Sequence, residues 1–233
     1  MSVPFKKINE ICAMAKVTLS IAEMNLVTQQ DFILTKNKII EKVYTLFGNV
    51  NEFYKMKFEK QYFLPKEIFT TSAKISRGEN YQQLPWVMLD YPRYFKGNDT
   101  VAIRTFFWWG HFVSIHFLVQ GKYVLPVKNI LITLAENGEI AENFDIFNEQ
   151  KNHNATWFLC KHHTPWQHSF EADNYLPLHL FTQQQIKSLS FIKLAKKIPL
   201  QEWENIEIFL QSSFLELLQL IKNASFPNDE TTL

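Results

Sequence analysis

Arginine and cysteine are scarce in this chain of 233 residues. Only three arginines occur beside 21 lysines, and all three lie between residues 77 and 104: Arg77, Arg93 and Arg104. Because arginine makes planar, bidentate contacts that lysine cannot make, this cluster marks where the chain departs from its preference for lysine. The two cysteines follow no Cys-x-x-Cys spacing, which predicts a reducing, cytoplasmic environment rather than a disulfide framework.

Several common functional motifs are also missing. The sequence has no glycine-rich dinucleotide or triphosphate loop, no His-Glu-x-x-His motif and no Gly-x-Ser-x-Gly nucleophile elbow. The formal net charge is +1, so there is no global field to attract nucleic acid or an anionic lipid surface. The N-terminal stretch lacks the uninterrupted apolar core of a signal peptide. We therefore expect neither nucleic acid nor a membrane as a partner.

Hydrophobic patterning predicts a single α+β domain over residues 1–233. Short runs of apolar, β-branched and aromatic residues predict a mostly antiparallel sheet, formed by about 84–120 and 155–160. An N-terminal helical pair and C-terminal helices are expected to flank this sheet. The predicted regions are, in order, a helical region at 4–47, a sheet-rich region at 84–181 and C-terminal helices at 182–223.

Five segments are predicted to be helical, four of them because their apolar residues recur at spacings of three and four. The second is expected to stop at Gly48-Asn49. Thr182 and Gln185 form a capping box, so a helix should begin there and continue until Pro199. In that helix the basic run 193–197 is interpreted as a solvated face. The five segments are 4–24, 30–47, 125–138, 182–198 and 201–222.

The sequence TFFWWGHF, residues 105–112, places five aromatic rings in eight positions. The arginine before it argues against a membrane span, and its aromatic and β-branched neighbours favour strands. With Gly110-His111 as a two-residue turn, the flanking strands form a hairpin. In that register Arg104 and His116 lie on opposite faces of the sheet.

Polar residues beside these aromatic strands form the leading candidate site. A buried guanidinium needs a partner, and Asp90 is the nearest carboxylate to Arg104 in the neighbouring strand. If Arg77 and Arg93 converge with Arg104, the function predicted is that of a non-catalytic, soluble binding module for a small anionic or aromatic ligand. The alternative is a structural ion pair that holds the strands in register. The candidate ligand-binding residues are Asp90, Arg93, Arg104, Trp109 and His116.

A second cluster, CKHHTPWQH at 160–168, offers potential metal ligands. Imidazole and thiolate groups suit zinc, and three or four of them make a site, so a metal-assisted hydrolase or nuclease is an alternative function. The competing interpretation is a polar loop whose histidines are exposed or bonded to the backbone. A third hypothesis is a structural or partner-binding protein whose aromatic face forms an interface. The candidate metal ligands are Cys160, His162, His163 and His168.

Overall fold

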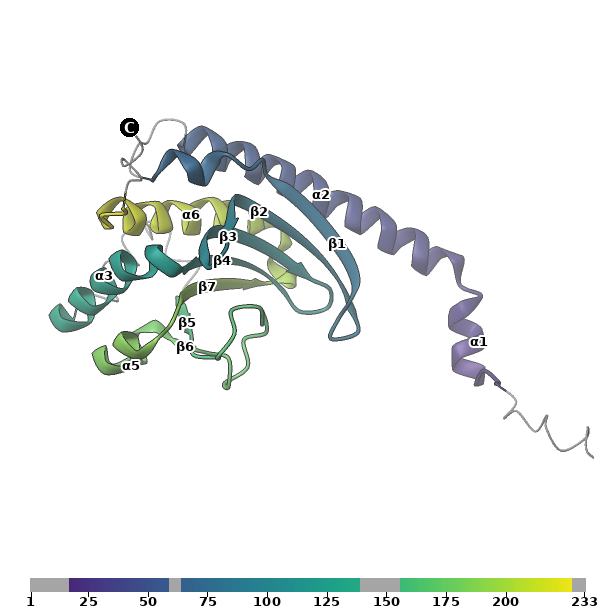
Figure 1. Ribbon diagram of the computed structural model, residues 1–233. Coiled ribbons are helices and arrows are strands. Elements are labelled where there is room, and N and C mark those ends of the chain that lie inside the picture. The colour runs from purple at the N-terminus through teal and green to yellow at the C-terminus, as the bar shows by residue number, and fades with distance from the viewer. Residues whose placement is uncertain (1–16, 59–63, 139–155, 228–233) are drawn as a thin grey trace, which may run out of the picture. The chain divides into compact units, whose positions relative to one another are not determined.

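The structure is a computed structural model that describes residues 17–58, 64–138 and 156–227. The strands form one antiparallel sheet in the order β1-β2-β3-β4-β7-β5-β6. Helices precede it and follow it along the chain (Figure 1). The predicted α+β class is therefore confirmed. Contacts divide the chain into two compact units, Met1–Glu41 and Lys42–Leu233.

The elements have the following bounds. The α-helices are α1 (Ile21–Val27), α2 (Gln30–Phe58), α3 (Val124–Asn137), α5 (Gln183–Ser188) and α6 (Ile206–Asn223). The strands are β1 (Lys74–Tyr81), β2 (Leu84–Lys96), β3 (Asp99–Trp108), β4 (Phe112–Gln120), β5 (Phe158–Cys160), β6 (Tyr175–Pro177) and β7 (Ile192–Pro199). Short 3-10 segments are η2 (Lys66–Phe69), η3 (Gly121–Tyr123), η4 (Leu178–Leu180) and η5 (Leu200–Asn205). None of the helices in these described ranges is long and apolar enough to cross a membrane.

The helix predictions succeed in part. Helix α3 matches the segment 125–138 and ends with Gly138 in the left-handed conformation, as expected. Helix α2 does not stop at Gly48-Asn49, because the flanking residues Phe47 and Val50 are fully buried and their packing offsets the low helix propensity of glycine. Of the predicted helix 4–24, residues 4–16 lie outside the described residues, as does the predicted loop at 139–154.

The two faces of the sheet have different covers. One face, which we call the helix face, meets helices of the second unit: Tyr54 of α2 lies 3.2 Å, oxygen to oxygen, from Thr105, and Glu216 of α6 accepts hydrogen bonds from Lys196 at 3.0 and 3.1 Å. One row of cross-strand neighbours on this face is Leu89, Thr105, Ile115 and Lys196.

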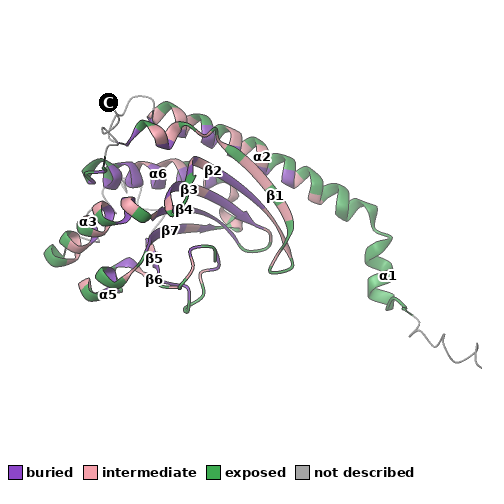
Figure 2. Ribbon diagram, viewed as in Figure 1, coloured by how far each residue is buried: buried purple, intermediate pink, exposed green. Residues whose placement is uncertain are grey.

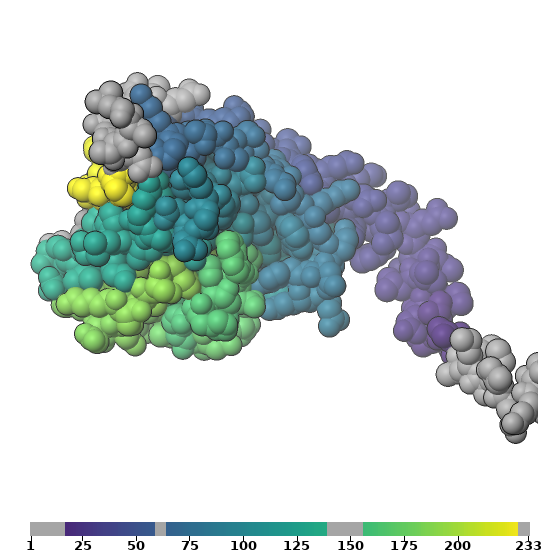
Figure 3. Space-filling model, in the orientation of Figure 1, coloured from purple at the N-terminus to yellow at the C-terminus, as the bar shows by residue number. Residues whose placement is uncertain are grey.

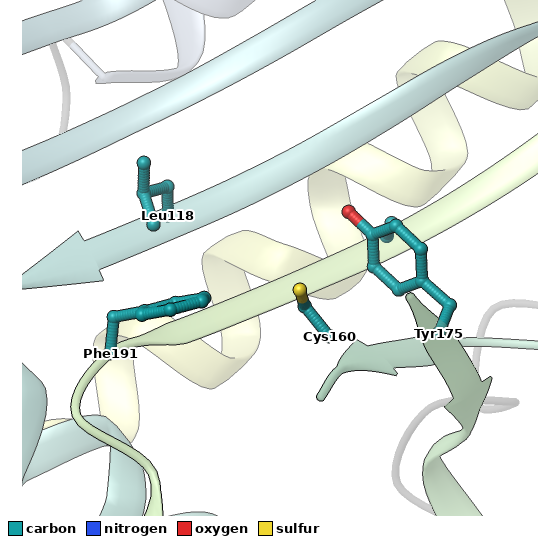
Figure 4. Close-up of a cluster of buried hydrophobic side chains, with 5 residues drawn as sticks. Leu118, Cys160, Tyr175 and Phe191 are labelled. Carbon is teal, nitrogen blue, oxygen red and sulfur yellow. The ribbon is translucent and has the colours of Figure 1, made fainter. Parts of the chain in front are cut away.

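The opposite face, which we call the loop face, is covered by the segment 156–181 (green in Figure 3). Its side chains pack onto the sheet in a buried cluster (Figure 4). The cluster consists of Leu118, Cys160, Tyr175, Phe191 and Ala195. Because both faces are covered, β3, β4 and β7 are buried along almost their whole length (Figure 2).

Strand β7 overturns the prediction of a helix from Thr182 to Pro199. The capping box of Thr182 and Gln185 forms as predicted, but helix α5 ends at Ser188. The following residues form a strand between β4 and β5. The basic run is not a solvated helix face, since Lys193 and Lys196 are 1% and 3% exposed and have polar partners on opposite faces of the sheet.

The hairpin register also differs from the prediction by one residue. A hydrogen bond from the His111 amide to the Trp108 carbonyl closes a turn whose third residue is Gly110, with φ +75°. The loop therefore has three residues rather than two, and Trp108 lies opposite Phe112. This shift brings Arg104 directly opposite His116, on the same face, whereas the predicted register separated them.

We predict that the buried pair under α6 is needed for stability. In Lys196→Met the Glu216 carboxylate stays buried without its cation, so the free energy of unfolding should fall by about 3–5 kcal/mol. The double variant Lys196→Met/Glu216→Leu removes both charges and should recover part of this loss; Trp157, whose indole N–H also donates to Glu216, would then lack that partner. Urea denaturation followed by circular dichroism measures both effects. Wild-type stability in Lys196→Met would contradict the prediction.

Candidate functional site

A row of polar side chains crosses the loop face at its centre. Asp90 on β2 lies opposite Arg104 on β3, which lies opposite His116 on β4. Arg104 donates two hydrogen bonds to the Asp90 carboxylate, from Nε at 2.7 Å and from Nη2 at 3.0 Å. Asp90 is thus the partner that the sequence predicted for Arg104. The bidentate contact occupies both nitrogen atoms, Nε and Nη2, on that edge of the guanidinium.

His116 is enclosed by hydrogen-bond partners. Its Nε2 lies 2.8 Å from the Ser114 hydroxyl, and its Nδ1 lies 3.1 Å from the Tyr175 hydroxyl. Burial, reinforced by Lys193 and Arg104, holds the pKa of His116 well below its ordinary value, so the ring is neutral. Ser114 and His116 are no more than 1% exposed, and therefore this Ser–His pair is closed to a substrate as it stands.

The loop at 165–169 is fastened to the sheet at several points. Lys193 on β7 donates to the carbonyl oxygen of Pro165 at 2.7 Å and to that of Gln167. The Tyr81 hydroxyl, at the end of β1, accepts hydrogen bonds from the amides of His168 and Ser169 at 2.7 and 3.1 Å. Side chains from two different strands thus fix the backbone on both sides of residue 166.

The fastened loop presents one large exposed ring. Trp166 is 49% exposed, and its ring centroid lies 5.8 Å from the Arg104 guanidinium carbon and 6.3 Å from the ring centroid of Phe95. Phe95, near the end of β2, is itself 42% exposed. Two exposed aromatic rings therefore lie beside the polar row.

Arg93 lies between these features. A bulge in β2 adds one residue between Asp90 and Arg93, so both face the loop side although they are three positions apart. Phe95, Arg93 and Asp90 occupy successive rows, opposite Thr100, Ala102 and Arg104. The row of Arg93 therefore lies between the rows of Phe95 and Arg104, the two side chains that lie near the ring of Trp166.

Arg93 carries the second guanidinium on the loop face. It is half-buried, its Nε atom is fully buried, and it forms no hydrogen bond or ion pair with any residue in the described ranges. A buried N–H without an acceptor is costly, which makes the Nε of Arg93 different from that of Arg104, which is paired with Asp90. We call Arg93, Phe95, Arg104 and Trp166 the aromatic–arginine site.

The structure brings together some of the predicted site residues and separates others. Asp90, Arg93, Arg104 and His116 share the loop face. Trp109 lies in the hairpin turn, with its ring 6.3 Å from that of Phe107 on the helix face, and Arg77 is exposed opposite Val87, which also belongs to the helix face. Three residues were missed because only tertiary contacts reveal them: Phe95, Trp166 and Lys193.

The candidate metal ligands do not converge. The Cys160 thiol donates to the Asn174 side chain at 3.4 Å, and burial raises its pKa. His162 contacts Thr164 and the ring of His163, whereas His168 belongs to the polar row. Over residues 17–58, 64–138 and 156–227, no three His, Cys, Asp or Glu side chains form a group that could hold a metal ion, so the zinc hypothesis gains no support.

Comparison of the chain with protein-family models, curated proteins and solved structures gave no match. The geometry of the site is thus the basis for a functional argument.

The two buried histidines predict a loss of stability in acid. Burial holds the pKa of His116 and His168 below the ordinary value of 6.5, so the unfolded chain binds more protons once the pH falls below 6.5. Each histidine should lower the free energy of unfolding by up to about 1.4 kcal/mol per pH unit in that range. Urea denaturation of His116→Gln between about pH 7.5 and pH 5 should give a shallower slope than the wild type.

His179→Gln provides the control, since His179 is exposed and should leave the slope unchanged. Equal slopes for the two variants would contradict the assignment of His116 as a neutral buried group.

Proposed function

We propose that this protein is a non-catalytic binding module for a small ligand that combines an anionic group with an aromatic ring. The proposal locates the ligand at the aromatic–arginine site. The observation that carries it is the guanidinium of Arg93, half-buried and without a hydrogen-bond or ion-pair partner in the described ranges.

Arg104 supplies an internal precedent for what Arg93 would bind. Arg104 directs its Nε and Nη2 atoms to the two oxygens of Asp90, at 2.7 and 3.0 Å. The Nε of Arg93 is buried without an acceptor among the described residues, whereas its two Nη atoms, which form no hydrogen bond there either, are not buried and remain open to a ligand. A carboxylate or phosphate can place two oxygens against the Nη atoms of a guanidinium, and charge-assisted, bidentate contacts of this kind are among the strongest hydrogen bonds in proteins.

The exposed rings of Trp166 and Phe95 support the aromatic half of the ligand. Their planes are tilted by 44° rather than stacked, and each ring leaves more than two fifths of its residue surface in solvent. Aromatic rings bind a flat, apolar group with little loss of side-chain entropy, since they have few rotatable bonds. The ring of the ligand would lie on this pair while its anionic group meets Arg93.

Binding is favoured over catalysis because the potential acid–base and nucleophilic groups on this face are enclosed. His116, Ser114 and Cys160 are each no more than 1% exposed and hydrogen-bonded within the protein. Arg104 and Asp90 neutralise each other. The buried free thiol of Cys160 is also compatible with the cytoplasmic location that we propose.

Calorimetric titration with benzoate, indole-3-carboxylate and phenyl phosphate tests the proposal, with benzamide as the uncharged analogue. We expect the wild type to prefer the anions, and Arg93→Gln to weaken their binding by at least about tenfold, as the loss of a charge-assisted contact of 1.5–3 kcal/mol implies. Trp166→Ala should weaken the aromatic anions but leave the affinity for acetate unchanged.

Arg77→Gln is the matched control, because Arg77 is an exposed arginine of the same sheet on the other face. Its affinities should equal those of the wild type. Absence of binding by all three aromatic anions at millimolar concentration, or equal loss in Arg93→Gln and Arg77→Gln, would refute the proposal.

A further inference from the structure

Lys193 holds the backbone carbonyl groups of the two residues that flank Trp166. The lysine is 1% exposed, and its Nζ donates to the carbonyl oxygens of Pro165 and Gln167. No carboxylate among the described residues forms an ion pair with it. The position of the exposed ring in the aromatic–arginine site therefore depends on a buried amine.

The ring of His168 lies between this amine and a permanent cation. Its Nδ1 is 3.3 Å from Lys193 Nζ, and its Nε2 is 3.3 Å from Arg104 Nη1. Arginine remains protonated and is held in place by Asp90, so Nε2 must accept and the imidazole proton must sit on Nδ1. The Nδ1–H group then points at Lys193, which has to accept a hydrogen bond.

A neutral amine satisfies this arrangement and an ammonium does not. The neutral form of Lys193 has two N–H donors for the carbonyls of Pro165 and Gln167, and one lone pair for the Nδ1–H of His168. An ammonium has three donors and no lone pair, so its third N–H would face the Nδ1–H. Because Arg104 is fixed by its carboxylate, the group that must move is the His168 ring, together with its loop.

The charged and titratable neighbours of Lys193 act on its pKa in both directions. Around it are Arg104 from β3, His116 from β4, Cys160 from β5, Tyr175 from β6 and His168 from the loop. The ring of Tyr175, 5.4 Å from Nζ, favours the ammonium, and so does Cys160. Burial, together with the nearby Arg104 charge, outweighs them and lowers the pKa of Lys193 to about 7.

We propose that Lys193 and His168 form a proton-sensitive latch on the loop 165–169. With Lys193 neutral, the latch is closed and Trp166 is held beside Arg104 and Phe95. When Lys193 takes up a proton, the His168 contact is lost and the loop is released. Control of ligand binding by this latch rests on the proposed function. The latch itself is a property of the ligand-free protein.

The sign of the pH effect follows from the two states of the loop. The pKa of Lys193 is about 7 in the closed state and returns toward 10.5 when the loop opens, so the open loop binds one more proton between these values. Each pH unit of acidification within this window should increase the opening equilibrium by about tenfold. The effect levels off below pH 7 and resumes below 6.5, where His168 gains a proton on opening.

Hydrogen exchange of the ligand-free protein, measured by mass spectrometry from about pH 7 to pH 9.5, tests the latch. The His168 and Ser169 amides, which donate to Tyr81, report loop opening. After correction for the intrinsic exchange rate, we expect their protection in the wild type to rise by about tenfold per pH unit. In Lys193→Met, protection should be independent of pH, and in His163→Gln, which removes an exposed imidazole of the same segment, it should follow the wild type.

Constant protection in the wild type, or a wild-type slope in Lys193→Met, would overturn the proposal. If Lys193→Met does not fold, titration of the wild-type lysines by carbon-13 NMR decides: one lysine with a pKa near 7 supports the latch, and 21 lysines that all titrate above about pH 9.5 refute it. Since no ligand is added, failure of the latch is separate from failure of the proposed function, which the Arg93→Gln titrations test.

Discussion

The second unit depends on burying a lysine on each face of one central strand. Lys193 and Lys196 of β7 are three residues apart, so they point to opposite sides of the sheet. Lys196 meets the Glu216 carboxylate under α6, and Lys193 meets the carbonyls of the 165–169 loop. Each cover of the sheet is thus attached through a polar group whose desolvation is compensated only when that cover is in place. The packing of helices and loop is consequently specific as well as apolar.

The elements that the sequence predicts well are those whose signals are local. The helix at 124–137 has an apolar face and a left-handed glycine cap, and the Thr182–Gln185 capping box forms as its residues require. Strand β7 was misread because a basic run with apolar residues suits a solvated helix equally well. Its strand conformation is decided by β4, β5 and Glu216, which are distant in sequence, and no local pattern reveals them.

Half of the candidate site could be predicted from the sequence. The pairing of Asp90 with Arg104 follows from the cost of an isolated buried charge, and the structure contains it. The shared face of Arg104 and His116 was missed, because one extra residue in the turn reverses the alternation of a whole strand. Trp166 was missed for a different reason: its position comes from backbone contacts of its neighbours, which side-chain patterns do not encode.

The bulge in β2 shifts the phase of that strand by one residue. In an unbroken strand, residues three apart face opposite sides, and Arg93 would carry its charge into the apolar helix face. With the insertion, both residues lie on the loop face: Asp90 forms an ion pair with Arg104, and Arg93 has no ion-pair partner within 17–58, 64–138 and 156–227. One strand thus carries a charge that stabilises the sheet, at Asp90, and a separate charge with no such role, at Arg93. A substitution of Arg93 would therefore leave the Asp90–Arg104 ion pair at the centre of the sheet intact.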